Sequence, residues 1–113
     1  MIIRRESMKK ETRPAMRGGP GAVDLINLSA APCTNCRLLA ELIIPPGAGI
    51  GVHEHVNETE YYLITGGAGI VTDDGKEVQV KAGDVVETGG GASHAIRNGG
   101  SAPLTMVAVI ITC

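Results

Sequence analysis

The chain of 113 residues has the length of a single domain and carries a formal net charge of −2. That charge gives no reason to expect a nucleic-acid or anionic-membrane partner, and no apolar run reaches the roughly 18 to 20 residues that span a membrane. Phe and Trp are absent, while sixteen Gly and six Pro favour short strands over helices. The apolar start at Met1–Ile3 is too short for a signal-peptide core, so we expect a cytoplasmic protein.

The first part of the chain lacks a clear apolar pattern. Residues 1 to about 22 are charged and rich in Gly and Pro, which predicts a loose arm, and Met8 is an alternative start. The basic residues of this arm alternate with Glu and include no aromatic residue, which favours a solvated tail over a binding patch. The apolar stretch Val23 to Leu28 predicts an edge strand. We therefore expect an N-terminal arm with an edge strand over 1–36 and a β-barrel domain over 37–113.

From residue 37 onward, apolar residues recur at every second position between turn signals, the pattern of half-buried strands. Asp73-Asp74-Gly75-Lys76 predicts a tight hairpin. The unbroken apolar run Val107 to Ile111 suggests burial on both faces, hence a sheet-on-sheet or subunit contact. Eight to ten short strands predict an all-β sandwich or barrel. The strands expected after residue 36 are 37–44, 50–55, 60–65, 68–72, 78–80, 85–88, 93–97 and 104–112.

The three cysteines leave two interpretations open. Cys33 and Cys36 form a CxxC pair, and Cys113 is the last residue. A zinc site would need two more ligands, and no second CxxC or spare histidine supplies them. A thioredoxin-like pair would precede a helix, whereas a strand-like run follows here. A structural or incidental pair, open to oxidation, is therefore favoured over a redox centre.

All three histidines of the chain fall in two short segments together with one glutamate. His53 and His55 are two residues apart in a predicted strand, so they project to the same face. Antiparallel pairing of the next strand would place Glu60 beside them, and barrel closure would bring in His94. Three imidazoles and a carboxylate suit manganese, iron, cobalt, nickel, copper or zinc. His-x-His alone is weak evidence, since two polar residues on a wet face share the pattern; the four residues together predict a divalent metal site.

Tyr62 is the candidate catalytic residue beside these four. It shares the parity of Glu60 in the predicted strand and should therefore face inward. A buried phenol next to a metal can donate a proton or a hydrogen bond. Packing in the core is the alternative role for Tyr62.

The two segments resemble the paired motifs of the cupins, small β-barrels of the jelly-roll type. The first cupin motif, G-x5-H-x-H-x3-4-E-x6-G, is filled by Gly47, His53, His55, Glu60 and Gly67. The second, G-x5-P-x-G-x2-H-x3-N, is filled by Gly83, Gly91, His94 and Asn98, with Gly89 in place of proline. Each motif occurs once, so the chain resembles a monocupin, a cupin with a single barrel. The resemblance implies a double-stranded β-helix over about residues 37–112, with the metal inside the barrel.

The resemblance also bounds the function. Cupins include dioxygenases, decarboxylases, isomerases and non-catalytic binding proteins, and the fold does not choose among them. The leading expectation is a metal-dependent enzyme acting on a small carboxylate or carbonyl compound. The alternatives are a non-catalytic, metal-supported barrel that binds a small molecule, and a structural dimer with a vestigial metal. Small cupins commonly dimerise, so a homodimer is expected, and no DNA-binding segment accompanies the barrel.

Overall fold

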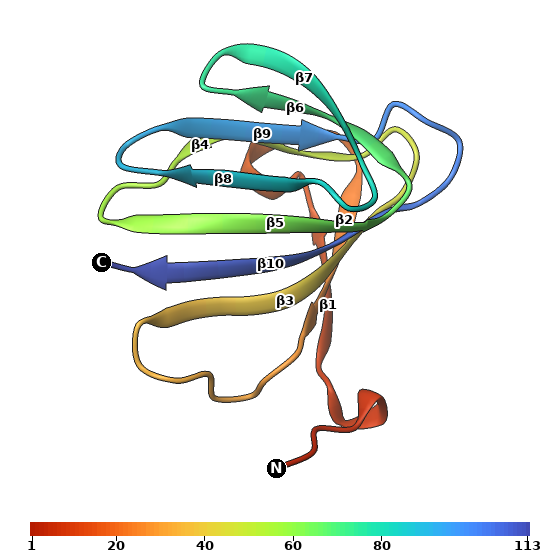
Figure 1. Cartoon of the computed structure of the whole chain (residues 1–113). Helices are drawn as coiled ribbons and strands as arrows, with labels where there is room; N and C mark the ends of the chain where they lie inside the picture. The colour runs from red at the N-terminus through yellow and green to blue at the C-terminus, as the bar shows by residue number, and fades with distance from the viewer.

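The computed structural model describes all 113 residues and consists almost entirely of antiparallel strands, which confirms the all-β prediction (Figure 1). Two short 3-10 turns, η1 and η2, are the only helical elements. The expected strands after residue 36 are present, with ends that differ from the predicted ones by two residues at most. The elements are η1 Arg5–Ser7, β1 Lys10–Pro14, η2 Met16–Gly18, β2 Ala22–Asn27, β3 Cys36–Ile44, β4 Gly49–Glu54, β5 Glu58–Gly66, β6 Ala68–Asp73, β7 Lys76–Lys81, β8 Val85–Gly89, β9 Ser93–Arg97 and β10 Leu104–Thr112.

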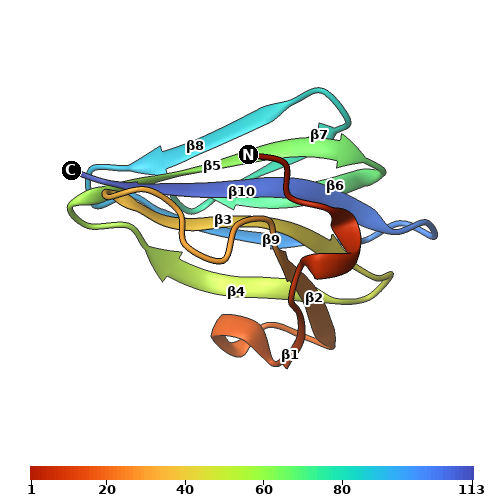
Figure 2. The same ribbon diagram turned by 90° about the horizontal axis from the view of Figure 1, so that it is seen from below.

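The strands form two sheets that enclose one core. The larger sheet has the order β1-β2-β3-β10-β5-β8, and the smaller has the order β4-β9-β6-β7. In Figure 1 the strands of the smaller sheet lie above β5, β10 and β3, and Figure 2 shows β4 on the opposite side of the molecule from β8. Sequential strands β4 and β5 thus belong to different sheets. The chain crosses from one sheet to the other between residues 54 and 58.

Most strands bury one face, because successive side chains point to opposite sides. Leu42 of β3, Ile64 of β5 and Met106 of β10 are buried, and Val71 and Ile96 meet them from the smaller sheet. The predicted hairpin is confirmed: β6 pairs with β7 through Asp74 and Gly75, which both have positive φ (48° and 89°). Two consecutive positive φ values are the signature of a tight hairpin turn.

The N-terminal segment is not loose at residues 10–14. β1 pairs with β2 from Lys10 opposite Ile26 to Pro14 opposite Ala22, so β1 rather than β2 is the sheet edge. The prediction failed because every residue of β1 is exposed, which leaves no apolar alternation to detect. β2 hydrogen-bonds to β3, so the sheet runs across residue 36, and the division of the chain at that point stays a prediction.

The turn η2 is seated tightly on β4. Gly49 N–H donates to the carbonyl oxygen of Pro20 at 3.0 Å. A Cβ on Gly51 would collide with the carbonyl oxygen of Arg17, and one on Gly19 would collide with that of Gly49. Only glycine permits this approach, so the segment after β1 covers the free edge of β4.

Within one chain, strand β10 is buried on one face only, so the expected subunit contact on its other face stays a prediction. Leu104 and Ala108 are fully buried, whereas Val107 and Val109 on the other face are half-buried and Ile111 is 38% exposed. The run is unbroken because its outward face is also apolar. No helix of the protein is both long enough and apolar enough to cross a membrane.

Candidate metal centre

Two of the three histidines are direct cross-strand neighbours. β4 pairs with β9 in antiparallel fashion, and His53 lies opposite His94. His94 therefore reaches the site through pairing within the smaller sheet, and the prediction that barrel closure brings it in is wrong. His55 follows the last residue of β4, and its backbone N–H donates to Ala92 O at 3.1 Å. Val52, the residue before His53 on β4, faces away from the site and is 66% exposed.

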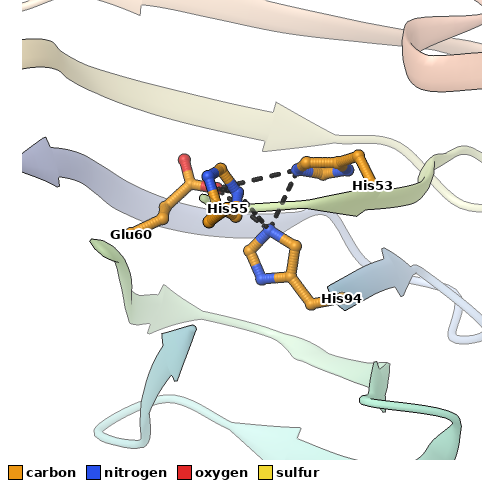
Figure 3. A group of neighbouring side chains, drawn as sticks. All are labelled: His53, His55, Glu60 and His94. Atoms are coloured by element: carbon orange, nitrogen blue, oxygen red, sulfur yellow. Dashed lines mark hydrogen bonds and ion pairs between the residues drawn. The ribbon is translucent and has the colours of Figure 1, made fainter. Parts of the chain in front are cut away.

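Glu60 comes from the facing sheet. β5 pairs with β10 and β8 and not with β4, so the expected antiparallel pairing beside the histidines is wrong. Asn57, with a positive φ of 58°, turns the chain out of the smaller sheet, and Glu60 then extends back across the barrel toward the imidazoles (Figure 3). The loop length alone suggested a hairpin, but it does not distinguish a hairpin from a crossing between sheets.

The four side chains point their ligand atoms at one another. Nε2 of His94 lies 3.0 Å from Nε2 of His55 and 3.0 Å from Nε2 of His53. Oε1 of Glu60 lies 2.9 Å from His55 Nε2, 3.0 Å from His94 Nε2 and 3.8 Å from His53 Nε2. Neighbouring ligands at 90° around an ion, with bonds of about 2.1 Å, are about 3.0 Å apart. The spacing of the donor set is compatible with a divalent metal ion.

The electrostatics of the cluster support this compatibility. His55, Glu60 and His94 are at most 3% exposed, and Glu60 Oε1 has no hydrogen-bond partner. Burial raises the pKa of Glu60, but the imidazoles of His53 and His94 outweigh it and hold this pKa at about 2. Burial lowers the pKa of His94, which favours its neutral, ligating form. A buried carboxylate oxygen among imidazole nitrogens lacks a counter-ion that a cation would supply.

The outer ring nitrogens of the three histidines have different surroundings. His53 Nδ1 lies 2.8 Å from the carbonyl oxygen of Gly51. His55 Nδ1 lies 2.6 Å from Oε2 of Glu58, a residue that no motif in the sequence marks. His94 Nδ1 is buried without a partner. Glu58 precedes the predicted start of its strand, so the sequence alone placed it in a loop.

Tyr62 faces inward, as its parity predicted. It is 2% exposed, its ring stacks on that of His94 with centroids 4.8 Å apart, and its hydroxyl lies 3.4 Å from His94 Nε2. Burial and the charge of Glu60 raise the pKa of Tyr62 well above its ordinary value. The phenol is therefore a neutral donor beside the cluster, and its catalytic role stays a prediction.

The cysteines lie apart from the cluster. Cys33 and Cys36 bracket a turn in which the Cys36 N–H donates to Cys33 O at 3.0 Å. Cys33, Cys36 and Cys113 are all free thiols, and none belongs to the group of converging ligand atoms. The choice between a structural and a redox role for the pair stays open.

Comparison with protein families agrees with the motifs. The cupin domain model matches residues 40–110, and this chain belongs to the cupin family. A relative named oxalate-binding protein from Thermotoga maritima is 42% identical over 98% of this chain and 93% of its own length. The fold is accordingly the double-stranded β-helix that the resemblance implied.

Solved structures give the same result. A crystal structure described as a predicted oxalate decarboxylase from Thermotoga maritima superposes with a TM-score of 0.95 at 41% identity and covers all of both chains. A sugar phosphate isomerase of the cupin superfamily from Silicibacter pomeroyi superposes with a TM-score of 0.80 at 20% identity, over all of this chain and 76% of its own. The second likeness concerns the fold alone.

Proposed function

We propose that His53, His55, Glu60 and His94 hold one divalent transition metal, drawn from manganese, iron, cobalt, nickel, copper and zinc. The observation that carries the proposal is the convergence of three Nε2 atoms on the buried Oε1 of Glu60, which has no hydrogen-bond partner. Neutral imidazoles with one carboxylate are an ordinary donor set for these ions. Such an ion acts as a Lewis acid on a bound oxygen.

The ligand proposed for this centre is a small carboxylate. A divalent ion with one glutamate and three neutral histidines has a net charge of +1, which favours an anion. Four protein donors leave two positions on a six-coordinate ion, enough for a bidentate ligand. The relative named oxalate-binding protein supports oxalate as the first compound to test.

The leading form of the proposal is an enzyme of the decarboxylase, dioxygenase or isomerase type, and the alternative is a binding protein without turnover. Tyr62 supports catalysis, since its neutral hydroxyl lies 3.4 Å from His94 Nε2 and can donate a proton at that side of the site. Its burial keeps this proton away from bulk water. Tyr62→Phe keeps the aromatic ring and removes only the hydroxyl group.

The test combines metal analysis, calorimetry and product detection. Protein loaded with each metal in turn is titrated with oxalate, and formate and carbon dioxide are then measured under air. Binding with turnover that Tyr62→Phe abolishes supports the enzyme, and binding without turnover supports the alternative. A wild-type chain that binds none of the metals contradicts both forms.

We further propose that the chain forms a homodimer through the outer face of the larger sheet. Leu63 and Val85 are 45% and 58% exposed there, beside the exposed Ile111 and the half-buried Val107 and Val109. Contiguous apolar surface of this kind is typical of interaction sites. Light scattering should give the mass of two chains for the wild type and of one chain for Leu63→Lys; a wild-type monomer at high concentration would rule this out.

A further inference from the structure

His55 differs from the other two histidines in having an ionised carboxylate at its outer ring nitrogen. Glu58 Oε2 lies 2.6 Å from His55 Nδ1, a distance typical of a short charge-assisted hydrogen bond. A carboxylate can only accept, so Nδ1 of His55 carries the proton and donates it to Glu58. In the neutral ring, which is the form that ligates a metal, this leaves Nε2 of His55 free of a proton and aimed at Glu60, 2.9 Å away.

Glu58 is itself held in place by an arginine. Nε and Nη2 of Arg37 donate to the two carboxylate oxygens of Glu58 at 2.9 and 2.8 Å. This paired geometry fixes both the position and the plane of the carboxylate. The cationic guanidinium at both oxygens favours the ionised form of the Glu58 carboxylate.

A β-bulge aims Arg37 at this carboxylate. Ile110 of β10 pairs with Leu38, and the next residue, Ile111, pairs with Cys36, so Arg37 has no partner in β10. Bulges commonly redirect a side chain next to a functional site. Strand parity alone assigns Arg37 to the outward face, and the bulge breaks that parity.

From these contacts we infer that Glu58, clamped by Arg37, is a positioning residue that fixes the tautomer and ring direction of His55 for metal binding. The inference rests on the proposed metal site and adds a residue pair to it that the cupin motifs do not contain. Carboxylates behind a ligating histidine are known to raise its basicity and orient its ring. His53 has the backbone carbonyl of Gly51 at this position and His94 has no partner, so His55 is the one donor of the three with a carboxylate behind it.

The chain offers a matched control. Arg97 Nη2 lies 2.9 Å from Glu77 Oε2, both side chains are about half exposed, and neither hydrogen-bonds to the cluster. Glu58→Ala and Arg37→Ala are compared with Glu77→Ala in titrations with cobalt, followed by the visible absorption of the ion. We expect affinity to fall about 10- to 100-fold for Glu58→Ala, less for Arg37→Ala, and to be unchanged for Glu77→Ala.

A second measurement uses the metal-free protein. Nitrogen NMR of the histidine rings should show His55 in a single tautomer with the proton on Nδ1, and a mixture of tautomers in Glu58→Ala. Glu58→Gln, which keeps an acceptor, should restore most of the wild-type tautomer. Arg37 is 47% exposed, so Arg37→Ala provides a well-folded variant even if Glu58→Ala unfolds.

The outcomes separate the two proposals. If wild-type protein binds cobalt and both Glu58→Ala and Arg37→Ala match Glu77→Ala in affinity and tautomer, the positioning role is overturned while the metal site stands. If wild-type protein binds no metal, both the proposed function and the metal-positioning role of Glu58 are contradicted.

Discussion

The histidines belong to the four-stranded sheet: His53 lies on β4, His55 directly follows β4, and His94 lies on β9. The six-stranded sheet carries Glu58 and Glu60 on β5. The imidazole donors thus come from one sheet and the carboxylates from the other. β5 lies between β10 and β8, but β4 is an edge strand with an irregular register between Ile50 and His53. The charged ligand, whose misplacement would leave an unpaired buried charge, sits on the strand with neighbours on both sides.

The largest loss of stability should come from a substitution in the core of the larger sheet. Ile64 of β5 is 1% exposed, so Ile64→Ala removes buried apolar volume and should lower the free energy of unfolding by about 2–5 kcal/mol. Val78→Ala, at a 41% exposed position of the smaller sheet, should cost less than about 1 kcal/mol. Urea unfolding measures both, and equal losses would show that the sheets are equally supported.

Removal of the negative charge of Glu60, the ligand from the larger sheet, should abolish tight metal binding. Glu60→Gln keeps the shape of the side chain, and we expect metal affinity to fall more than about 100-fold, because changes one layer further out already cost 10- to 100-fold. Competition with a coloured chelator measures the affinity. A variant that binds as tightly as the wild type would mean that the histidine sheet suffices.

The same carboxylate should make the metal-free fold sensitive to acid. The pKa of Glu60 is about 2 in the folded protein, below its ordinary 4.5, so its ionised form stabilises the fold above about pH 4.5. This stabilisation is lost as the pH falls from about 4.5 to about 2. Between those values the wild type should lose more free energy of unfolding than Glu60→Gln, as thermal unfolding in chelator would show; parallel curves would argue against it. The pKa of Glu58, about 2 as well, affects both proteins alike.

The smallest loss of stability should come from a substitution in the hairpin between β6 and β7 of the smaller sheet. Gly75 has a φ of 89° with open space around it, so Gly75→Ala adds only backbone strain and should cost about 1 kcal/mol. Metal affinity should change little, because Gly75 itself does not contact the cluster, although Asp73 of the same hairpin lies opposite His94. A loss of affinity in this variant would show that the edge hairpin supports the histidines after all.

Most of the strands and the four candidate ligands could be predicted from the sequence, because apolar alternation locates strands and spaced motifs locate ligands. The partners of each strand could not: the short link between His55 and Glu60 fits a hairpin as well as a crossing between sheets. Glu58 was not predicted to contact His55 because it precedes the predicted start of its strand. Arg37 was not predicted to contact Glu58 for a different reason. Parity arguments assume an unbroken strand, and the bulge at Arg37 is visible only in the register with β10.

Strand β1 has a consequence beyond the fold itself. Its five residues, Lys-Glu-Thr-Arg-Pro, are all exposed and form the outer edge of the larger sheet. Alternating charges and a terminal proline make a poor template for a strand from another molecule. β2, the next strand of the sheet, would without β1 offer its unpaired backbone N–H and C=O groups to any extended chain. The charged N-terminal strand therefore closes the sheet with an edge that disfavours pairing with a strand of another molecule.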